Sequence, residues 1–347
     1  MEPRTEESVV PKLRILHHVC PRCQWVLFMY SIVISIAGFA QTDRNALLDT
    51  LDARHDKSKP AIERLEIMSM HAEALFAQGR SAERAVLAKE YMALAQEIGT
   101  DSVLAEAYGM LAGREDGGSM SASLKYYLLS REYAIKANAG GRVSFAEKQI
   151  GILYKEMKDY STAMGYLKRA LPVAADAGQV NRVSCHIGEI MLALGKPDSA
   201  LFYAQRSNVF VNPADDPYGY ARSQLVLGNT YAALGERDQS DAFLRRCVAI
   251  CDSFDVVLPL TQALTAQTAA LIASGRASEA IITGKRSLAI AARSPSLSND
   301  IEAADVLWKA YRAAGKSDSA LVYAVLVSDV YKRQCSCCCA WPPSPRC

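Results

Sequence analysis

The stretch LVLGNTYAALGERDQS, residues 225–240, contains an apolar segment, a glycine and the start of a second, more polar segment. Gly228, Tyr231 and Leu234 follow one another at three-residue steps, which places them on one face of an α-helix. Gly235 comes directly after them, and glycine readily takes the positive φ angle that ends a helix. The stretch therefore predicts a helix, a tight turn and a second helix.

This pattern recurs with a fixed spacing. Glycines stand at positions 195, 235, 275 and 315, which are 40 residues apart. A large apolar residue precedes each glycine by four positions and a small residue follows it by five, and Lys158 takes the glycine position in an earlier unit. Seven such units predict an all-α fold, an α-solenoid of about seven antiparallel helix pairs. The small residues that open the predicted second helices are Ala85, Ser123, Ala163, Ala200, Ser240, Ala280 and Ala320.

The pattern also resembles a known family. The order small residue, tyrosine, glycine, small residue, carried by Gly228, Tyr231, Gly235 and Ser240, is similar to the tetratricopeptide repeat (TPR). The period of 40 residues resembles the long-repeat variants of that family, whereas Trp308 departs from it at a small-residue position. The resemblance implies a TPR-like superhelix whose first helices line a concave groove, with a partner protein or peptide bound there.

Residues 1–40 have the organisation of a secretory signal peptide. Trp25–Phe39 is a 15-residue run without a charge, preceded by Lys12, Arg14 and Arg22 and followed by small residues. The run is shorter than the roughly 20 residues that a membrane-spanning helix needs. We therefore predict a cleaved signal, with an uncleaved anchor as the alternative. Either reading makes the protein exported, and periplasmic or otherwise extracytoplasmic.

The rest of the chain divides into three predicted parts. Residues 41–59 form a leading helix or cap, residues 60–328 the repeat array, and residues 329–347 a tail that is non-native or disordered. Cysteines crowd this tail without the paired spacing or the histidines of a metal knuckle. The organisation as a whole resembles the exported TPR input region of Bacteroidetes-type membrane regulators, whose histidine kinase or DNA-binding output module is missing here.

The charge balance argues against a nucleic-acid partner. The chain has 39 basic and 37 acidic residues, whereas nucleic-acid binders usually carry a clear basic excess. The sequence contains no phosphate-binding loop, no nucleophile elbow and no zinc-binding helix motif. We therefore expect no enzyme, no cofactor and no metal. Contact with a membrane is expected only through the signal or anchor, or through a missing C-terminal segment.

The cysteines, histidines and tyrosines of the array are expected to have structural roles. Cys247 occupies a small-residue position of a predicted second helix, with Cys251 one turn later, so we expect buried thiols there. His71 and His186 lie in first helices without a second metal ligand three or four residues away, which indicates structural or surface side chains. The tyrosines of the array are expected to pack between helices.

Charged and polar residues recur at the groove-facing positions of the first helices. Arg182 and Arg222 occupy the same position in successive units, and Asn229 lies two helical turns after Arg222. In the TPR family such a set resembles a clamp that grips a carboxylate. The alternative is that these are ordinary solvated side chains, some of them paired with Glu189. The predicted groove residues are Lys148, Arg182, Glu189, Arg222, Asn229, Gln262 and Lys309, with Phe145, Lys155 and Arg312 beside them.

Together, these observations predict a non-catalytic, exported scaffold whose groove binds a protein or peptide. The alternative function is that of a truncated periplasmic sensory domain from a membrane-bound signalling regulator.

Overall fold

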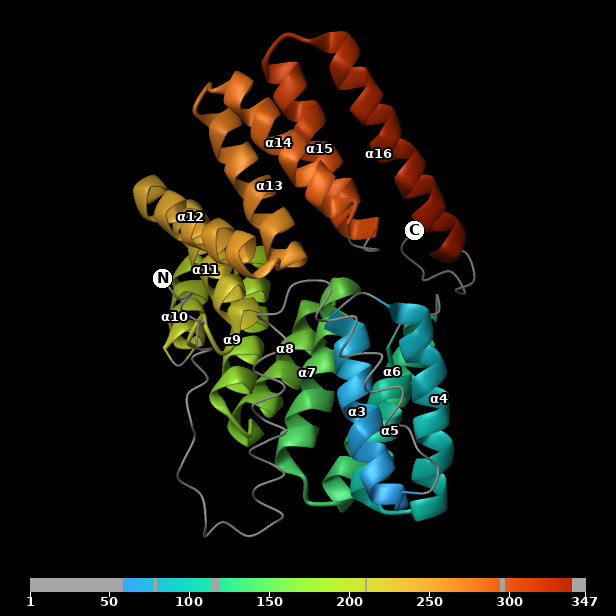
Figure 1. The fold of residues 1–347 in the computed structure, drawn as a ribbon. Coiled ribbons are helices and arrows are strands. Elements are labelled where there is room, and N and C mark those ends of the chain that lie inside the picture. The colour runs from blue at the N-terminus through green and yellow to red at the C-terminus, as the bar shows by residue number, and fades with distance from the viewer. Residues whose placement is uncertain (1–58, 78–79, 114–118, 210, 294–296, 339–347) are drawn as a thin grey trace, which may run out of the picture.

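The fold is a stack of helix pairs. The computed structural model describes residues 59–77, 80–113, 119–209, 211–293 and 297–338, and within these ranges it contains fourteen α-helices and no strand (Figure 1). Consecutive helices form seven antiparallel pairs, which confirms the predicted fold class. The pairs are α3 (Ala61–Ala77) with α4 (Ser81–Ile98), α5 (Asp101–Leu111) with α6 (Met120–Lys136), α7 (Gly140–Glu156) with α8 (Tyr160–Ala170), α9 (Ala177–Ala193) with α10 (Pro197–Asn208), α11 (Pro217–Ala233) with α12 (Arg237–Phe254), α13 (Val257–Ala273) with α14 (Ala277–Ala291), and α15 (Leu297–Ala313) with α16 (Ser317–Cys338). A short 3₁₀ helix, η1 (Leu171–Val173), follows α8.

Several predicted segments lie outside the described residues. These are the signal peptide, residues 1–40, the leading helix up to residue 58, and residues 339–347 of the tail. Residues 329–338, which the sequence assigns to the tail, continue α16. None of the described helices combines the length and the apolar character that crossing a membrane requires.

Positive φ angles end the first helices where the repeat places its glycines. The φ angles of Gly195, Gly235, Gly275 and Gly315 are +67°, +82°, +72° and +72°. No neighbouring group lies within 4 Å of the place that a Cβ would take at these glycines, so the backbone angle rather than the space requires glycine there. Lys158, at the corresponding position after α7, adopts φ of +60°, as its place in the repeat predicts.

Small residues inside the helices allow the two members of a pair to approach closely. A Cβ on Gly228 of α11 would lie 2.8 Å from the Leu244 side chain of α12. The small residues that open the second helices are buried, apart from Ala85, which is half-buried. Ala85 comes one residue later than the repeat predicts. A shift of one residue turns the side chain by roughly 100° around the helix axis, away from the buried face. Ala88, three residues later in α4, is buried.

Aromatic side chains join the two helices of several pairs. Tyr154 of α7 stacks on Tyr166 of α8 with 5.6 Å between ring centroids, and Tyr231 of α11 stacks on Phe243 of α12 at 5.4 Å. These contacts confirm the predicted packing role of the tyrosines, and they lie at equivalent positions of different units. Each pair thus repeats the same internal packing.

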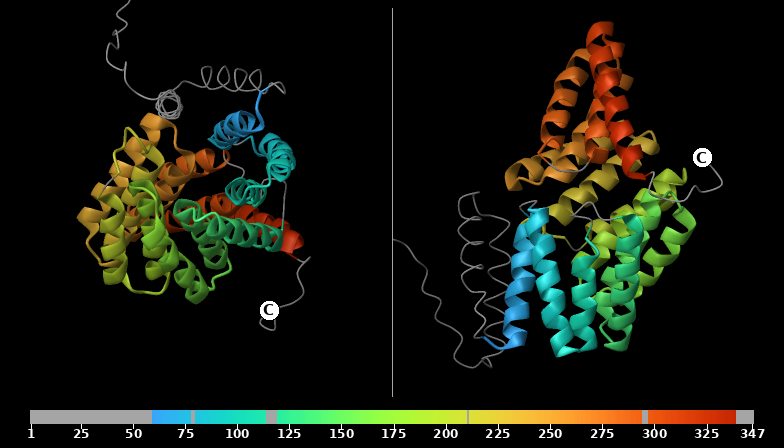
Figure 2. Two further views of the ribbon diagram at one scale, coloured as in Figure 1. Left: turned by 90° about the horizontal axis from the view of Figure 1, so that it is seen from below. Right: turned by 90° about the vertical axis from the view of Figure 1, so that its right-hand side faces the viewer.

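The pairs follow a curved path, which brings distant first helices to face one another. Viewed from below, α3 to α12 pass round a common centre (Figure 2). The charge of Arg182 on α9 acts on Glu73 of α3, and the charge of Lys155 on α7 acts on Glu302 of α15. The charges of α9 and α7 therefore act on carboxylates of helices near the two ends of the array.

Gly228→Ala will destabilise the array, because the new Cβ would lie 2.8 Å from the Leu244 side chain and 3.4 Å from its backbone nitrogen. We expect the free energy of unfolding to fall by about 1–3 kcal/mol, as measured by urea unfolding followed by circular dichroism. Gly165→Ala in α8 is the matched control, since only the flexible guanidinium of Arg169, 3.8 Å away, borders the site. Higher helix propensity should stabilise that variant by up to about 1 kcal/mol. Equal stability of Gly228→Ala and the wild type would contradict the close packing.

Candidate functional site

Four of the predicted groove residues lie on three neighbouring first helices at the centre of the array. Lys148 is on α7, Arg182 and Glu189 are on α9, and Arg222 is on α11. These are the first helices of three successive pairs. Arg182 and Arg222 stand 13 residues before Gly195 and Gly235 and so share one repeat position, whereas Lys148 and Glu189 stand at other positions of their units.

Glu189 lies at the middle of an ionic cluster that joins these three helices. Its carboxylate accepts a hydrogen bond from Arg222 Nη2 at 2.5 Å and another from Lys155 Nζ at 2.6 Å. His186 Nδ1 lies 3.0 Å from Arg222 Nη2, and Tyr218 Oη lies 3.4 Å from Arg222 Nη1. We call Lys155, His186, Glu189, Tyr218 and Arg222 the central cluster. One predicted alternative, a pairing of a groove arginine with Glu189, is thus observed for Arg222.

The members of the central cluster hold one another in fixed charge states. Burial alone would raise the pKa of Glu189, but the charges of Arg222 and Lys155 outweigh burial and hold that pKa well below its usual range. Burial, together with the charge of Arg222, lowers the pKa of His186 to about 3. Nδ1 of His186 faces two donors, Arg222 Nη2 and Lys155 Nζ, so it is the acceptor of a neutral imidazole.

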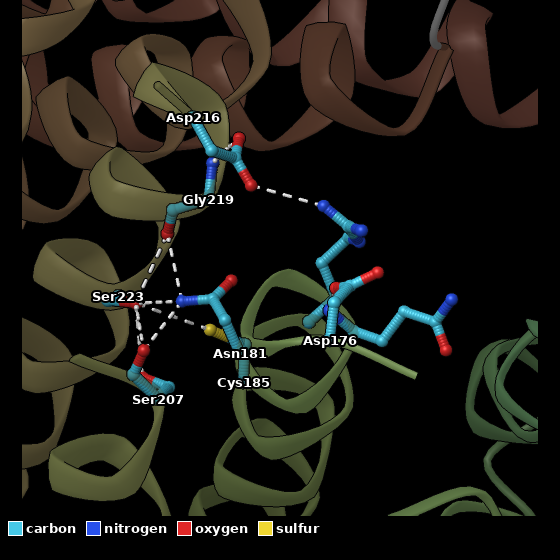
Figure 3. Close-up of polar contacts among 9 residues, drawn as sticks. Asp176, Asn181, Cys185, Ser207, Asp216, Gly219 and Ser223 are labelled. Atoms are coloured by element: carbon cyan, nitrogen blue, oxygen red, sulfur yellow. Dashed lines mark hydrogen bonds and ion pairs between the residues drawn. The ribbon is translucent and has the colours of Figure 1, made fainter. Parts of the chain in front are cut away.

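Arg182 is held by the helix that follows it. Its Nη1 donates a hydrogen bond to Asp216 Oδ2 over 3.1 Å, and Asp216 also caps α11 by accepting from the Gly219 nitrogen at 2.8 Å (Figure 3). Asp216 stands directly before Pro217, a combination that is typical of a helix start. The sequence therefore carries the signal for the cap, but the ion pair with Arg182 depends on how α9 and α11 pack.

A buried polar network fixes α9 on its neighbours beside Arg182. Nδ2 of Asn181 donates to the Ser207 carbonyl of α10 at 2.7 Å and to Ser223 Oγ of α11 at 2.5 Å (Figure 3). The Asn181 side chain is only 1% exposed, and Cys185 Sγ lies in the same network, 3.9 Å from Ser223 Oγ. This network locks the α9–α10 pair onto α11, and so determines how far Arg182 lies from the residues of α11.

Lys148 differs from the two arginines because no carboxylate binds it. Its Nζ lies 4.9 Å from the centre of the Phe145 ring, and the described part of the chain offers it no hydrogen bond or ion pair. Burial, together with the positive charges of Arg182 and Arg222, lowers the pKa of Lys148 to about 7, although Asp176 partly offsets them. Lys148 is therefore a half-buried amine in a positive electrostatic field.

The three other predicted groove residues, Asn229, Gln262 and Lys309, are not part of the central cluster. Asn229 is half-buried on α11, two turns after Arg222, and Gln262 is half-buried on α13. Lys309 is exposed on α15 and donates to Asp305 of its own helix at 2.6 Å. The pairing of Lys309 within one helix turn is the ordinary solvated arrangement of a surface lysine.

Two residues of the site have roles that the sequence pattern does not indicate. His186, expected to be a structural or surface side chain, is 8% exposed and bonded to the central cluster. Asp216 receives no role in the repeat pattern, yet it neutralises Arg182. Both roles arise only when successive first helices lie side by side.

The described residues contain no group of three or more His, Cys, Asp or Glu side chains that could hold a metal ion. Cys247 and Cys251 are free and fully buried, as predicted for structural thiols. Cys247 Sγ lies 3.8 Å from the Pro259 carbonyl of the next pair.

Mild acid will destabilise the array through His186. Its pKa is lower in the folded chain than its ordinary value of 6.5, so the unfolded chain takes up a proton first as the pH falls. Between pH 6.5 and about pH 5, the wild type should lose about 1–2 kcal/mol of unfolding free energy that His186→Gln retains. Urea unfolding at the two pH values measures the difference. Equal losses in both proteins would show that His186 is not neutral in the fold.

One repeat of the array matches a known family in sequence. Residues 221–253, which comprise most of α11 and α12, match the family described as Tetratricopeptide repeat. No curated protein matches the chain significantly.

Solved structures share the fold over most of the chain. A Rap protein complexed with Competence and Sporulation Factor is 12% identical, with a TM-score of 0.61, over 84% of this chain and 81% of that one. The quorum sensor NprR from B. thuringiensis is 16% identical, with a TM-score of 0.59, over 88% and 86% of the two chains. A Signal Transduction ATPase with Numerous Domains from Pyrococcus horikoshii, which has a tetratricopeptide repeat sensor, is 12% identical, with a TM-score of 0.54, over 84% of this chain and 47% of its own. At these identities the likeness concerns the fold alone, and it supports a TPR-like α-solenoid with a recognisable tetratricopeptide repeat at residues 221–253.

Proposed function

We propose that the array is a non-catalytic scaffold that binds a protein or peptide segment along the concave side of α7, α9 and α11. The observation that carries this proposal is the set of basic side chains on three successive first helices: Lys155 of α7 and Arg222 of α11 meet at Glu189 of α9, and Arg182 of α9 has the same repeat position as Arg222. An extended segment that crosses three parallel helices contacts each of them in turn, and solenoids commonly use their concave side in this way. The Rap structure, described as a complex with a factor, and the quorum sensor NprR are consistent with this class of function.

The site is already organised without a partner. The central cluster and the Asn181 network hold the arginines in position, so little side-chain freedom remains to be lost on binding. Preorganisation of this kind favours recognition of a defined chemical group at a defined place.

The same contacts support a non-catalytic role. A nucleophile needs an adjacent base and access to a substrate. Cys185 is fully buried, and the Nδ1 atom of His186 is occupied by the Arg222 guanidinium. His186, Glu189 and Arg222 are thus bonded to one another rather than arranged for proton transfer to a substrate.

The binding proposal is tested with a photo-reactive side chain on the concave side. Phe145 on α7, which is 40% exposed, is replaced by p-benzoyl-phenylalanine, and the full chain is incubated with peptides selected from a random dodecapeptide library on the wild-type protein. We expect selected peptides to crosslink at position 145 and to compete with one another. Phe202 on α10, which is 60% exposed on a second helix, is the control position and should give no crosslink. Failure to select any peptide, or crosslinking at position 202 alone, would contradict the proposal.

We infer as a second candidate an exported sensory role, as the periplasmic input part of a membrane-bound signalling regulator of the Bacteroidetes type. The basic residues followed by the uncharged run Trp25–Phe39 support export, and the tetratricopeptide repeat sensor of the Pyrococcus protein supports sensing. Fusion of residues 1–40 to alkaline phosphatase tests export, because that enzyme is active only outside the cytoplasm. Genomic DNA downstream of codon 328 tests the regulator. An inactive fusion, or a nearby stop codon without a membrane-spanning segment, would remove this candidate.

A further inference from the structure

A row of basic side chains follows the exposed side of the second helices. In α8, α10, α12 and α14, the tenth and eleventh residues after the turn position of the unit are exposed. The turn positions of these units are Lys158, Gly195, Gly235 and Gly275. All of these exposed residues except Gln205 are basic, and we call them the outer basic row: Lys168, Arg169, Arg206, Arg245, Arg246, Lys285 and Arg286.

The outer basic row is separate from the concave side. Successive first helices pack against one another, as α9 does on α11 and α11 on α13, whereas the second helices pack mainly on first helices. The exposed side of a second helix therefore points away from the first helices. Arg286 of α14 donates a hydrogen bond to Asp252 of α12 at 2.6 Å, so the exposed sides of these two second helices lie close enough for one ligand to contact both.

The ends of the helices do not explain the row. Basic residues in the last turn stabilise a helix through its dipole, and this reason applies to α8 and α10. It does not apply to α12 and α14, which carry no basic residue in the last turn. Arg246 and Lys285 lie near the middle of these two helices. The row therefore follows the repeat position rather than the helix end.

The protein itself neutralises only part of the row. Three members pair with carboxylates of the chain: Arg169, Arg245 and Arg286. Four members have no ion pair among the described residues: Lys168, Arg206, Arg246 and Lys285. Nη2 of Arg286 lies 2.6 and 2.7 Å from the two carboxylate oxygens of Asp252, which shows that a carboxylate fits against a member of the row.

Aromatic rings hold two arginines of the row in place. The Arg169 guanidinium lies 4.3 Å from the centre of the Tyr166 ring, and the Arg246 guanidinium lies 5.4 Å from the centre of the Phe243 ring. Both rings stack in turn on a tyrosine of the first helix of the same pair. A guanidinium held on a ring loses little freedom when it binds a carboxylate with its N–H groups.

We propose that the outer basic row binds an acidic segment of a partner protein, at a surface separate from the concave site of the proposed function. The segment crosses successive second helices, and its carboxylates pair with the four members of the row that have no ion pair. A single exposed ion pair contributes little, so the affinity comes from several contacts along one segment. A short peptide that meets only one or two of these helices binds weakly and is not enriched when dodecapeptides are selected.

The shape of the array favours a protein segment over an anionic membrane. The helix pairs follow a curved path, and the row turns with them (Figure 2). A flexible segment can follow this turn and contact each second helix. A flat bilayer would touch only part of the row at one time.

The test uses the full chain and fluorescent peptides, with binding followed by fluorescence anisotropy at low salt, where exposed charges are screened least. The acidic probe consists of four copies of Glu-Glu-Gly-Ser-Gly-Ser, with an acetylated N-terminus and a C-terminal fluorophore. The neutral probe has glutamine in place of glutamate.

Two triple variants separate the row from the overall charge of the protein. The test variant removes three charges of the row that have no ion pair: Arg206→Gln, Arg246→Gln and Lys285→Gln. The control variant removes the same charge from exposed positions outside the row: Lys125→Gln, Lys136→Gln and Lys316→Gln. Far-UV circular dichroism checks that both variants fold as the wild type does.

We expect the wild type to bind the acidic probe tenfold or more tightly than the neutral probe. The test variant should lose at least fivefold in affinity for the acidic probe, and the control variant less than twofold. A charge-reversed variant should instead prefer a probe with lysine in place of glutamate, because the charges of surface and segment are then exchanged: Arg206→Glu, Arg246→Glu and Lys285→Glu.

Three outcomes would overturn the inference. The first is equal binding of the acidic and neutral probes, and the second is an equal loss of affinity in the test and control variants. The third is binding of vesicles of phosphatidylglycerol and phosphatidylcholine without binding of the acidic probe, which would make the row a membrane surface. The concave site is tested separately, by the crosslink at position 145, so either proposal can fail while the other stands.

Discussion

A single helix pair cannot bury its own apolar stripe, and the whole array depends on covering that stripe with the next pair. The helices are amphipathic, so each pair offers one apolar face to its predecessor and another to its successor. Small residues at the crossing points make this possible: Gly228 leaves room for the Leu244 side chain, and Gly151 leaves room for Leu167. The close approach of helix axes then sets the position of every side chain on the concave side.

The repeated packing of helix pairs also determines which charged side chains of neighbouring first helices lie close together. Because successive units are related by a nearly constant rotation, residues at the same repeat position form a row along the first helices. Arg182 and Arg222 belong to one such row, and residues of neighbouring rows supply Glu189 and Lys155 between them. A cluster that spans three helices thus needs no special loop, only charged residues on facing sides of adjacent first helices.

The ion pairs on this face hold α7, α9 and α11 together. Glu189 of α9 accepts hydrogen bonds from Lys155 of α7 and from Arg222 of α11, and Asp216 before α11 accepts one from Arg182 of α9. Lys148 differs from these cations, because its Nζ lies beside the Phe145 ring, 4.9 Å from the ring centre, and has no ion pair among the described residues.

The sequence by itself determined the helix pairs, their number and their turns, because these depend on local properties. A positive φ angle after each first helix and an apolar stripe with helical period are visible within one unit, as Gly235, Tyr231 and Lys158 show. The repeat also predicts groove positions for Lys148, Arg182 and Arg222, and this remains a prediction. Which charges pair could not be derived from spacing, since the pairing of Arg182 with Asp216 depends on the angle between pairs and on the Asn181 network that fixes it. Only the tertiary structure, which places residues from separate repeats within hydrogen-bonding distance, decided that the arginines are occupied and that Lys148 is not.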